Sequence, residues 1–190
     1  MMDRRQFLKT GLGLAGSLAL PAGLVQAAPS ELVREIDFNL RQGERRFSLV
    51  RAETQERLDL VYMVDGRWVR GAYPQICHLM RDVQAGQTVN MDLRLLGVLD
   101  WLQSYLRHQG YGDPIYVTSG YRSRRTNARI EGAAKDSEHT RGRALDLHVP
   151  GIKAGYMAAK LKQLQQGGVG TYSARHFVHL DTGAVRSWQG

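Results

Sequence analysis

Cysteine is nearly absent from this chain, because Cys77 is the single one among 190 residues. One cysteine cannot form an intramolecular disulfide, so the fold must depend on a hydrophobic core and on any metal ion that it binds. Cys77 lies at helical spacing within the segment YPQICHLMRDV, which indicates a small buried residue and not a nucleophile. The sequence therefore excludes a disulfide scaffold and gives no support to thiol catalysis.

A long uninterrupted apolar run is also missing. The most apolar stretch, residues 12–24, is diluted by glycines and Pro21 and is shorter than the ~20 residues that span a membrane. It follows Arg4-Arg5-Gln6-Phe7-Leu8-Lys9, a pattern typical of a twin-arginine (Tat) export signal. We expect residues 1–27 to be a cleaved signal peptide, with no stable membrane insertion afterwards and a periplasmic mature protein. The alternative is an anchor that is retained.

Basic residues are plentiful but scattered, and they do not alternate with aromatic residues. The net charge is +8, and residues 1–27 contribute +2 of it, so the mature chain stays basic. A basic exported protein is attracted to anionic polymers, although charge alone does not choose among them. Without a basic-aromatic pattern, and with an export signal, the sequence does not favour nucleic acid as a partner.

Internal repeats, low-complexity tracts and long linkers are absent too, which favours one domain over residues 28–190. We divide it into a small β region, residues 28–72, and a metal-binding core, residues 73–190. Alternating apolar residues and turn signals predict the strands, and apolar stripes predict the helices. The expected strands are 46–50, 58–63, 68–69, 115–118, 144–149 and, as the final one, 177–180; the expected helices are 73–83, 91–108 capped by Asn90, and 152–166, with a turn at 167–170 and a short helix or loop at 127–135. The fold class is therefore α+β, with a mainly antiparallel sheet and helices packed on one side.

Three residues suggest a metal site. His139 and Asp146 are separated by six residues, and His179 follows in HFVHLD. Asp146 lies between Leu145 and Leu147, where an ionised carboxylate is costly unless it is paired or bound to a cation. Two histidines and one carboxylate suit zinc, and three protein ligands leave a fourth position for water, as in catalytic sites. The alternative is that Asp146 forms an ion pair with Arg143 or Arg122 and that His139 is an exposed loop residue.

The combined motifs resemble the zinc peptidases that cleave D-alanyl-D-alanine and murein cross-links, a group related to lysostaphin-type enzymes and to the hedgehog signalling domain. The likeness is strongest to the MepK-type murein endopeptidases. It is carried by Ser119-Gly120-Tyr121-Arg122-Ser123, Asn127, Ser137-x-His139-x-x-Gly142-x-Ala144-x-Asp146 and Phe177-Val178-His179-Leu180-Asp181. The resemblance implies that His139, Asp146 and His179 bind one Zn²⁺ per chain.

The resemblance also implies roles for other polar residues. Arg122 would meet a substrate carboxylate or stabilise the developing oxyanion, and Ser137 would bind substrate or orient a ligand. The general base departs from the family pattern, which places an acidic residue three positions before the last ligand or a histidine two positions before it. Here those positions hold His176 and Phe177. We take His176 as the candidate base, with Asp181 and His148 as the alternatives.

The sequence thus predicts an exported zinc metallopeptidase, acting as a monomer on the peptide stems of peptidoglycan and cutting their cross-links. A carboxypeptidase of the D-Ala-D-Ala type is the alternative within the same chemistry. A non-catalytic, zinc-containing wall-binding module is the alternative outside it.

Overall fold

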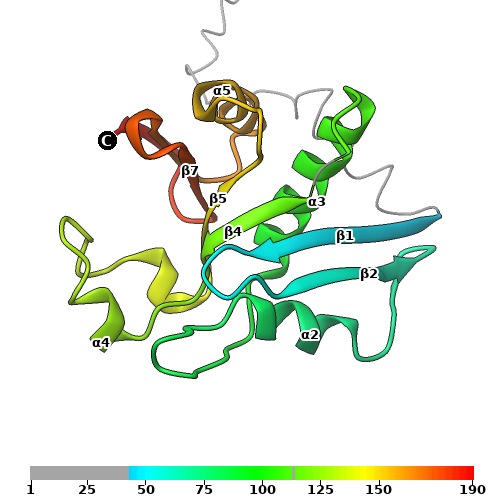
Figure 1. Ribbon diagram of the computed structural model, residues 1–190, viewed down its shortest axis with the longest axis horizontal. Coiled ribbons are helices and arrows are strands. Elements are labelled where there is room, and N and C mark those ends of the chain that lie inside the picture. Colours follow the sequence, from blue (N-terminus) through cyan, green and yellow to red (C-terminus); the bar gives the residue numbers. More distant parts are fainter. Residues whose placement is uncertain (1–42, 113) are drawn as a thin grey trace, which may run out of the picture.

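The computed structural model describes residues 43–112 and 114–190, so the expected signal segment lies outside the described residues (Figure 1). Within these residues, eight strands form one sheet in the order β3-β2-β1-β4-β5-β7-β6-β8. Their bounds are Glu44–Arg51 (β1), Arg57–Val64 (β2), Arg67–Trp68 (β3), Ile115–Ser119 (β4), Ala144–His148 (β5), Gly168–Tyr172 (β6), Phe177–Asp181 (β7) and Arg186–Gln189 (β8). Among these neighbours, β1 pairs with β4 in parallel and β6 pairs with β8 in parallel, and the other pairs are antiparallel. The expected α+β fold with a mainly antiparallel sheet is confirmed.

The helices follow the apolar stripes of the sequence. They are Ala72–Leu79 (α2), Leu93–His108 (α3), Arg124–Asn127 (α4) and Ala154–Leu164 (α5), with short 3-10 turns at Glu138–Arg141 (η1) and Ser173–Arg175 (η2). The expectation that Asn90 caps α3 is wrong, because Asp92 occupies the cap and its carboxylate accepts a hydrogen bond from Arg94 N at 2.7 Å. None of the helices in the described part of the chain is long and apolar enough to cross a membrane.

One face of the sheet carries the hydrophobic core. Side chains alternate along a strand, so Leu145 and Leu147 of β5 face the core with Val178 and Leu180 of β7, and all four are at most 2% exposed. The same core contains residues from the three longer helices: Ile76, Leu79, Leu95, Leu99, Leu102, Met157 and Leu161. Figure 1 shows the α4 segment apart from α3 and α5, at one end of the molecule. By the same alternation, Asp146 and His179 project from the face that these helices leave open.

The glycine-rich segment 167–170, expected to be a turn, continues into strand β6, and a further strand, β8, follows β7. Strand β6 in place of a turn, and the additional strand β8, have the same cause. β6 pairs with β7 and β8, so Gly168 lies beside Arg186, and Gly170 beside Trp188. A Cβ atom on Gly170 would lie only 2.6 Å from Cε2 of Trp188. These glycines are low in strand propensity but make room for large side chains from the neighbouring strand.

Replacing Gly170 with alanine should therefore lower the free energy of unfolding by about 1–3 kcal/mol, because the added methyl group overlaps the Trp188 ring. The matched control is Gly97→Ala in α3, where no atom lies within 4 Å of the added Cβ. That change should stabilise the protein by about 0.5–1 kcal/mol. Denaturant unfolding measures both, and equal effects of the two variants would contradict this explanation of β6.

Candidate metal centre and active site

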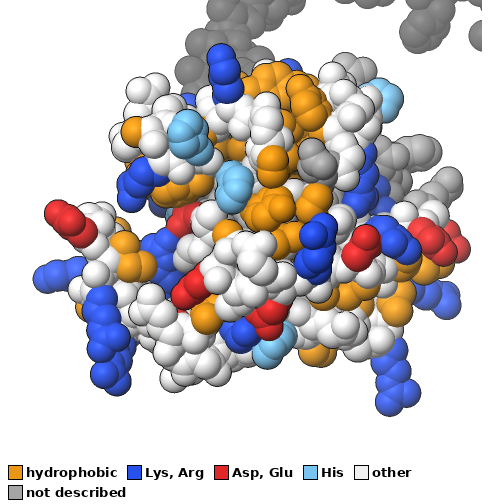
Figure 2. Space-filling model, in the orientation of Figure 1, with side chains coloured by type: hydrophobic (Ala, Val, Ile, Leu, Met, Phe, Trp, Pro, Cys, Tyr) orange, Lys and Arg blue, Asp and Glu red, His pale blue; other side chains and the backbone are white. Residues whose placement is uncertain are grey.

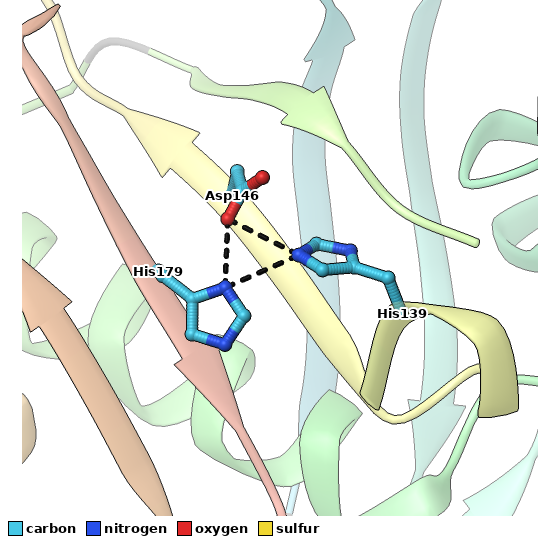
Figure 3. A group of neighbouring side chains, drawn as sticks. All are labelled: His139, Asp146 and His179. Carbon is cyan, nitrogen blue, oxygen red and sulfur yellow. Dashed lines mark hydrogen bonds and ion pairs between the residues drawn. The ribbon is translucent and has the colours of Figure 1, made fainter. Parts of the chain in front are cut away.

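Three side chains converge on the open face of the sheet (Figure 3). His139 comes from η1, and Asp146 and His179 face each other across the paired strands β5 and β7. Oδ1 of Asp146 lies 3.2 Å from Nε2 of His139 and 2.8 Å from Nδ1 of His179, and the two nitrogens are 3.1 Å apart. All three residues are buried. The structure therefore brings together the three ligands expected from the sequence.

The short η1 turn positions His139. It begins at Ser137, whose Oγ accepts a weak hydrogen bond from His139 N at 3.4 Å, and it ends at Gly142 with φ +68°. A Cβ on Gly142 would meet Asn90 O at 2.9 Å, in addition to being strained at this φ. Glycine thus lets the chain turn directly from the histidine into β5.

Hydrogen bonds on the outer side of each imidazole decide which nitrogen faces the cluster. Nδ1 of His139 donates to the carbonyl oxygen of Gly120 at 2.6 Å, and Nε2 of His179 donates to Oδ2 of Asp181 at 3.0 Å. In the neutral rings, Nε2 of His139 and Nδ1 of His179 are then lone-pair acceptors pointing at a carboxylate oxygen. Three acceptors that face one another favour a metal cation, or a proton, between them.

The spacing of these atoms suits zinc. Bonds of ~2.0–2.1 Å at tetrahedral angles place ligand atoms roughly 3.3 Å apart, close to the 2.8–3.2 Å measured here. The carbonyl and carboxylate behind the two histidines are the outer partners that metal-binding imidazoles usually have. His139, Asp146 and His179 thus fit the metal in both spacing and chemistry.

The pKa shifts describe a site that favours positive charge. Burial lowers the pKa of His139 and keeps it neutral. Burial would raise the pKa of Asp146, but the neighbouring histidines lower it well below its usual range. Burial would likewise lower the pKa of His179, yet hydrogen bonds to Asp146 and Asp181 raise it above its ordinary value. Two carboxylates around one imidazole therefore favour a proton or a metal cation at this point.

Asp181, one of the alternative bases, lies behind His179. Its carboxylate also accepts hydrogen bonds from Gly168 N, Gly183 N and the guanidinium of Arg186, the last at 2.7 and 3.0 Å. With every oxygen engaged, Asp181 orients the imidazole of His179. The sequence reasoning missed Arg186, and the alternation of Arg186-Ser187-Trp188 is the signal that could have found it.

Asp181→Asn should weaken zinc binding by about 10–100-fold, because an amide supports the ligand histidine less well than a carboxylate. Competition with a chromogenic chelator measures the affinity. Asp136→Asn is the control, since the Asp136 side chain is 92% exposed and should leave the affinity unchanged. An Asp181→Asn protein that holds zinc as tightly as the wild type would exclude this role.

Arg122 and Ser137 lie in the wall of a cavity that reaches the cluster. Nη2 of Arg122 bonds to Oδ2 of Asp146, the oxygen that turns away from the histidines, and Nε donates to Ser119 Oγ at 2.7 Å. Arg122 is thereby fixed directly beside the candidate metal position. The ion pair considered as an alternative for Asp146 does exist here, and it coexists with the histidine contacts.

The other two candidate bases are placed differently. His176 is exposed, with φ +57° at the end of η2, and it is not in the cavity wall although its neighbours Arg175 and Phe177 are. His148 stacks on Tyr116, with ring centroids 5.0 Å apart, and is also outside the wall. Among the described residues, the structure therefore brings neither histidine into contact with the cluster.

Two cavities meet at the cluster. One has a volume of about 610 Å³ and the other about 290 Å³, and both include Arg122 and Asp146 in their walls. Figure 2 shows this face hollowed between the α4 segment and the part of the chain near the C-terminus, with acidic and basic side chains at the hollow.

Aromatic residues that the sequence did not reveal complete the larger cavity. Trp188 has its ring centroid 5.2 Å from that of His179, and its Nε1 donates to the hydroxyl of Tyr172 at 3.0 Å. Trp188 thus lies beside His179, and Tyr172 lies beside Trp188, both in the wall of the larger cavity.

A buried His-Asp-His cluster that could hold a metal ion and opens onto a groove, on a mainly antiparallel α+β sheet, is an arrangement typical of metallohydrolases. Residues 40–188 match the model of the family described as "Peptidoglycan L,D-endopeptidase MepK". The chain therefore belongs to this family of peptidases, which confirms the resemblance found in the sequence, and it is an enzyme of that class.

Curated relatives agree with the family match over nearly the whole chain. Proteins named peptidoglycan L,D-endopeptidase MepK from Escherichia coli K12 and Shigella flexneri are 34% identical over 98% of this chain and 97% of their own length. A protein named probable peptidoglycan L,D-endopeptidase MepK, from Haemophilus influenzae, is 30% identical over 99% of this chain and 96% of its own length.

Proposed function

We propose that this protein is a zinc endopeptidase that cuts peptide cross-links of peptidoglycan, at a bond between an L and a D centre. The printed names of its relatives support the substrate and the bond. The observation that carries the proposal is the cluster of His139, Asp146 and His179, whose three acceptor atoms converge at the meeting point of two cavities.

The two cavities favour an endopeptidase over a carboxypeptidase. An endopeptidase must hold peptide on both sides of the scissile bond, whereas a carboxypeptidase needs room for only one residue beyond it. Here spaces of about 610 and 290 Å³ adjoin at Arg122 and Asp146, and each would hold the peptide on one side of the scissile bond.

The residues of the centre divide the chemistry among them. Bound zinc would supply a water of lowered pKa and polarise the scissile carbonyl group. Asp146 and the two histidines would hold the ion, while Gly120 O and Asp181 keep the imidazoles oriented. Arg122, fixed by Asp146 and Ser119, presents positive charge to the carbonyl oxygen as negative charge develops on it. Ser137 lies in the same wall, where it would contact the bound peptide.

We also propose that the mature enzyme acts in the periplasm as a monomer, after export through the twin-arginine route. The Arg4-Arg5 motif and the following apolar run support the route. All three metal-binding side chains come from one chain, so the centre needs no second copy.

Incubation of the purified chain, without residues 1–27, with isolated muropeptides tests this function. Dimers linked between an L and a D centre should fall to monomers, and a chelator should stop the reaction. Loss of terminal D-alanine alone would identify a carboxypeptidase, and tight wall binding with intact substrates would identify a non-catalytic module.

A further inference from the structure

Arg51, at the end of β1, is a buried cation with unused hydrogen-bond donors. It is 4% exposed, and its Nε and Nη1 have no hydrogen-bond partner among the described residues. Its ion pair is with Glu53, at 3.6 Å, and the Glu53 side chain is 47% exposed. A guanidinium in this setting is costly, because burial removes water from N–H groups that nothing replaces.

Arg51 and its unused donors lie beside the smaller of the two cavities. Arg51 lies in the wall of the 290 Å³ cavity, together with Thr118, whose buried Oγ1 also lacks a partner among the described residues. The parallel pairing of β1 with β4 places Arg51 opposite Val117, next to Thr118. Both residues therefore line one small space, and each carries a buried polar atom without a partner among the described residues.

Apart from the exposed Glu53, the acidic residues of this wall, Asp82 and Asp146, are engaged elsewhere. Asp82 accepts hydrogen bonds from Ser123 N at 2.8 Å and Ala85 N at 3.0 Å, which tie its carboxylate into the adjoining turn. Asp146 is engaged by Arg122 and the two histidines. Burial lowers the pKa of Arg51, because the buried charge has lost water that its neighbours do not fully replace. The guanidinium nevertheless stays charged.

A carboxylate fits these donors. The planar guanidinium presents paired N–H groups that match the two oxygens of a carboxylate, and the Thr118 hydroxyl adds a third donor. We propose that Arg51, assisted by Thr118, binds a free carboxylate of the peptide stem that lies in the smaller cavity, and that this contact selects the substrate. The inference rests on the proposed peptidase function and names the residue that recognises one stem.

Cross-linked muropeptides with defined carboxylates test the proposal. One substrate keeps every carboxylate free, a second is amidated at the terminal carboxylate of the stem, and a third is amidated at the side-chain carboxylate. For the wild type, amidation at the recognised position should raise KM by about 10–100-fold, as expected for loss of a charge-assisted contact, with little change in kcat. Whichever amide shows this effect identifies the source of the carboxylate.

Arg51→Met should raise KM for the free substrate by the same factor and should no longer distinguish the free from the amidated form. Arg46→Met, on the same strand, removes an exposed ion pair with Asp59 and should behave as the wild type. The melting temperature of Arg51→Met should be unchanged or higher, because the variant removes an unsatisfied buried charge. A purely structural arginine would show the opposite, a lower melting temperature.

Equal slowing of all three substrates by Arg51→Met, or a wild type that ignores amidation, would overturn the inference. Neither result would touch the peptidase function, because the wild type would still cleave the free substrate in a zinc-dependent reaction. A wild type that cleaves none of the three would instead refute the proposed function itself.

Discussion

Asp146→Asn is expected to reduce peptidase activity by at least about 10³-fold and to abolish stoichiometric zinc binding. The carboxylate supplies the negative charge of the cluster, and its Oδ1 lies within 3.2 Å of both histidine nitrogens. An asparagine of the same shape removes that charge and leaves Arg122 without its carboxylate partner. Loss of metal chemistry costs several kcal/mol of transition-state stabilisation, which corresponds to about three orders of magnitude in rate. Muropeptide turnover and zinc per chain measure the two effects.

The control for this variant is Asp59→Asn, on β2, which removes an exposed carboxylate paired with Arg46. It should keep full activity and one zinc per chain. Because Asp146 is buried, far-ultraviolet circular dichroism must show that Asp146→Asn is folded. A folded Asp146→Asn protein with normal turnover would contradict the assignment of the ligand.

Removal of the metal from the wild type should have an equally large effect on activity and a clear effect on stability. Without a cation, three acceptor atoms remain 2.8–3.2 Å apart in a buried site. A ligand present at 100 times its Kd stabilises a protein by about 2.7 kcal/mol, so the melting temperature should fall by about 5–10 °C. Dialysis against a chelator, followed by thermal unfolding and turnover assays, measures both.

Stoichiometric Zn²⁺ should restore activity and melting temperature, whereas Mg²⁺ should not, because imidazole ligands suit zinc and magnesium prefers oxygen. In Asp146→Asn, the chelator should change neither quantity. Full activity after exhaustive chelation would show that the cluster is not a catalytic metal site.

The parts of the site that local sequence encodes could be predicted. Asp146 stands out as a carboxylate inside an apolar strand, and its neighbours Leu145 and Leu147 indicate which face it occupies. Gly142 marks the sharp turn after His139. The stripe of leucines in α3 and the alternation in β5 likewise follow from helix and strand periods, so the fold class was within reach.

The remaining features depend on pairing between distant segments. Strand β6 contains glycines that read as a turn, and only its contacts with β7 and β8 make it a strand. The chain of contacts from Arg186 through Asp181 to His179 arises from this arrangement. Arg51 reaches the site because β1 pairs in parallel with β4, a long-range contact that periodicity does not specify. The exposure of His176 likewise follows from η2 and its left-handed backbone.

Zinc X-ray absorption spectroscopy of the purified mature protein tests the central claim most directly. Binding by His139, Asp146 and His179 predicts four nitrogen or oxygen neighbours at about 2.0–2.1 Å, with the outer-shell scattering of two imidazoles and one position filled by water. A spectrum with sulfur neighbours, or without imidazole scattering, would show that these three residues do not hold the metal.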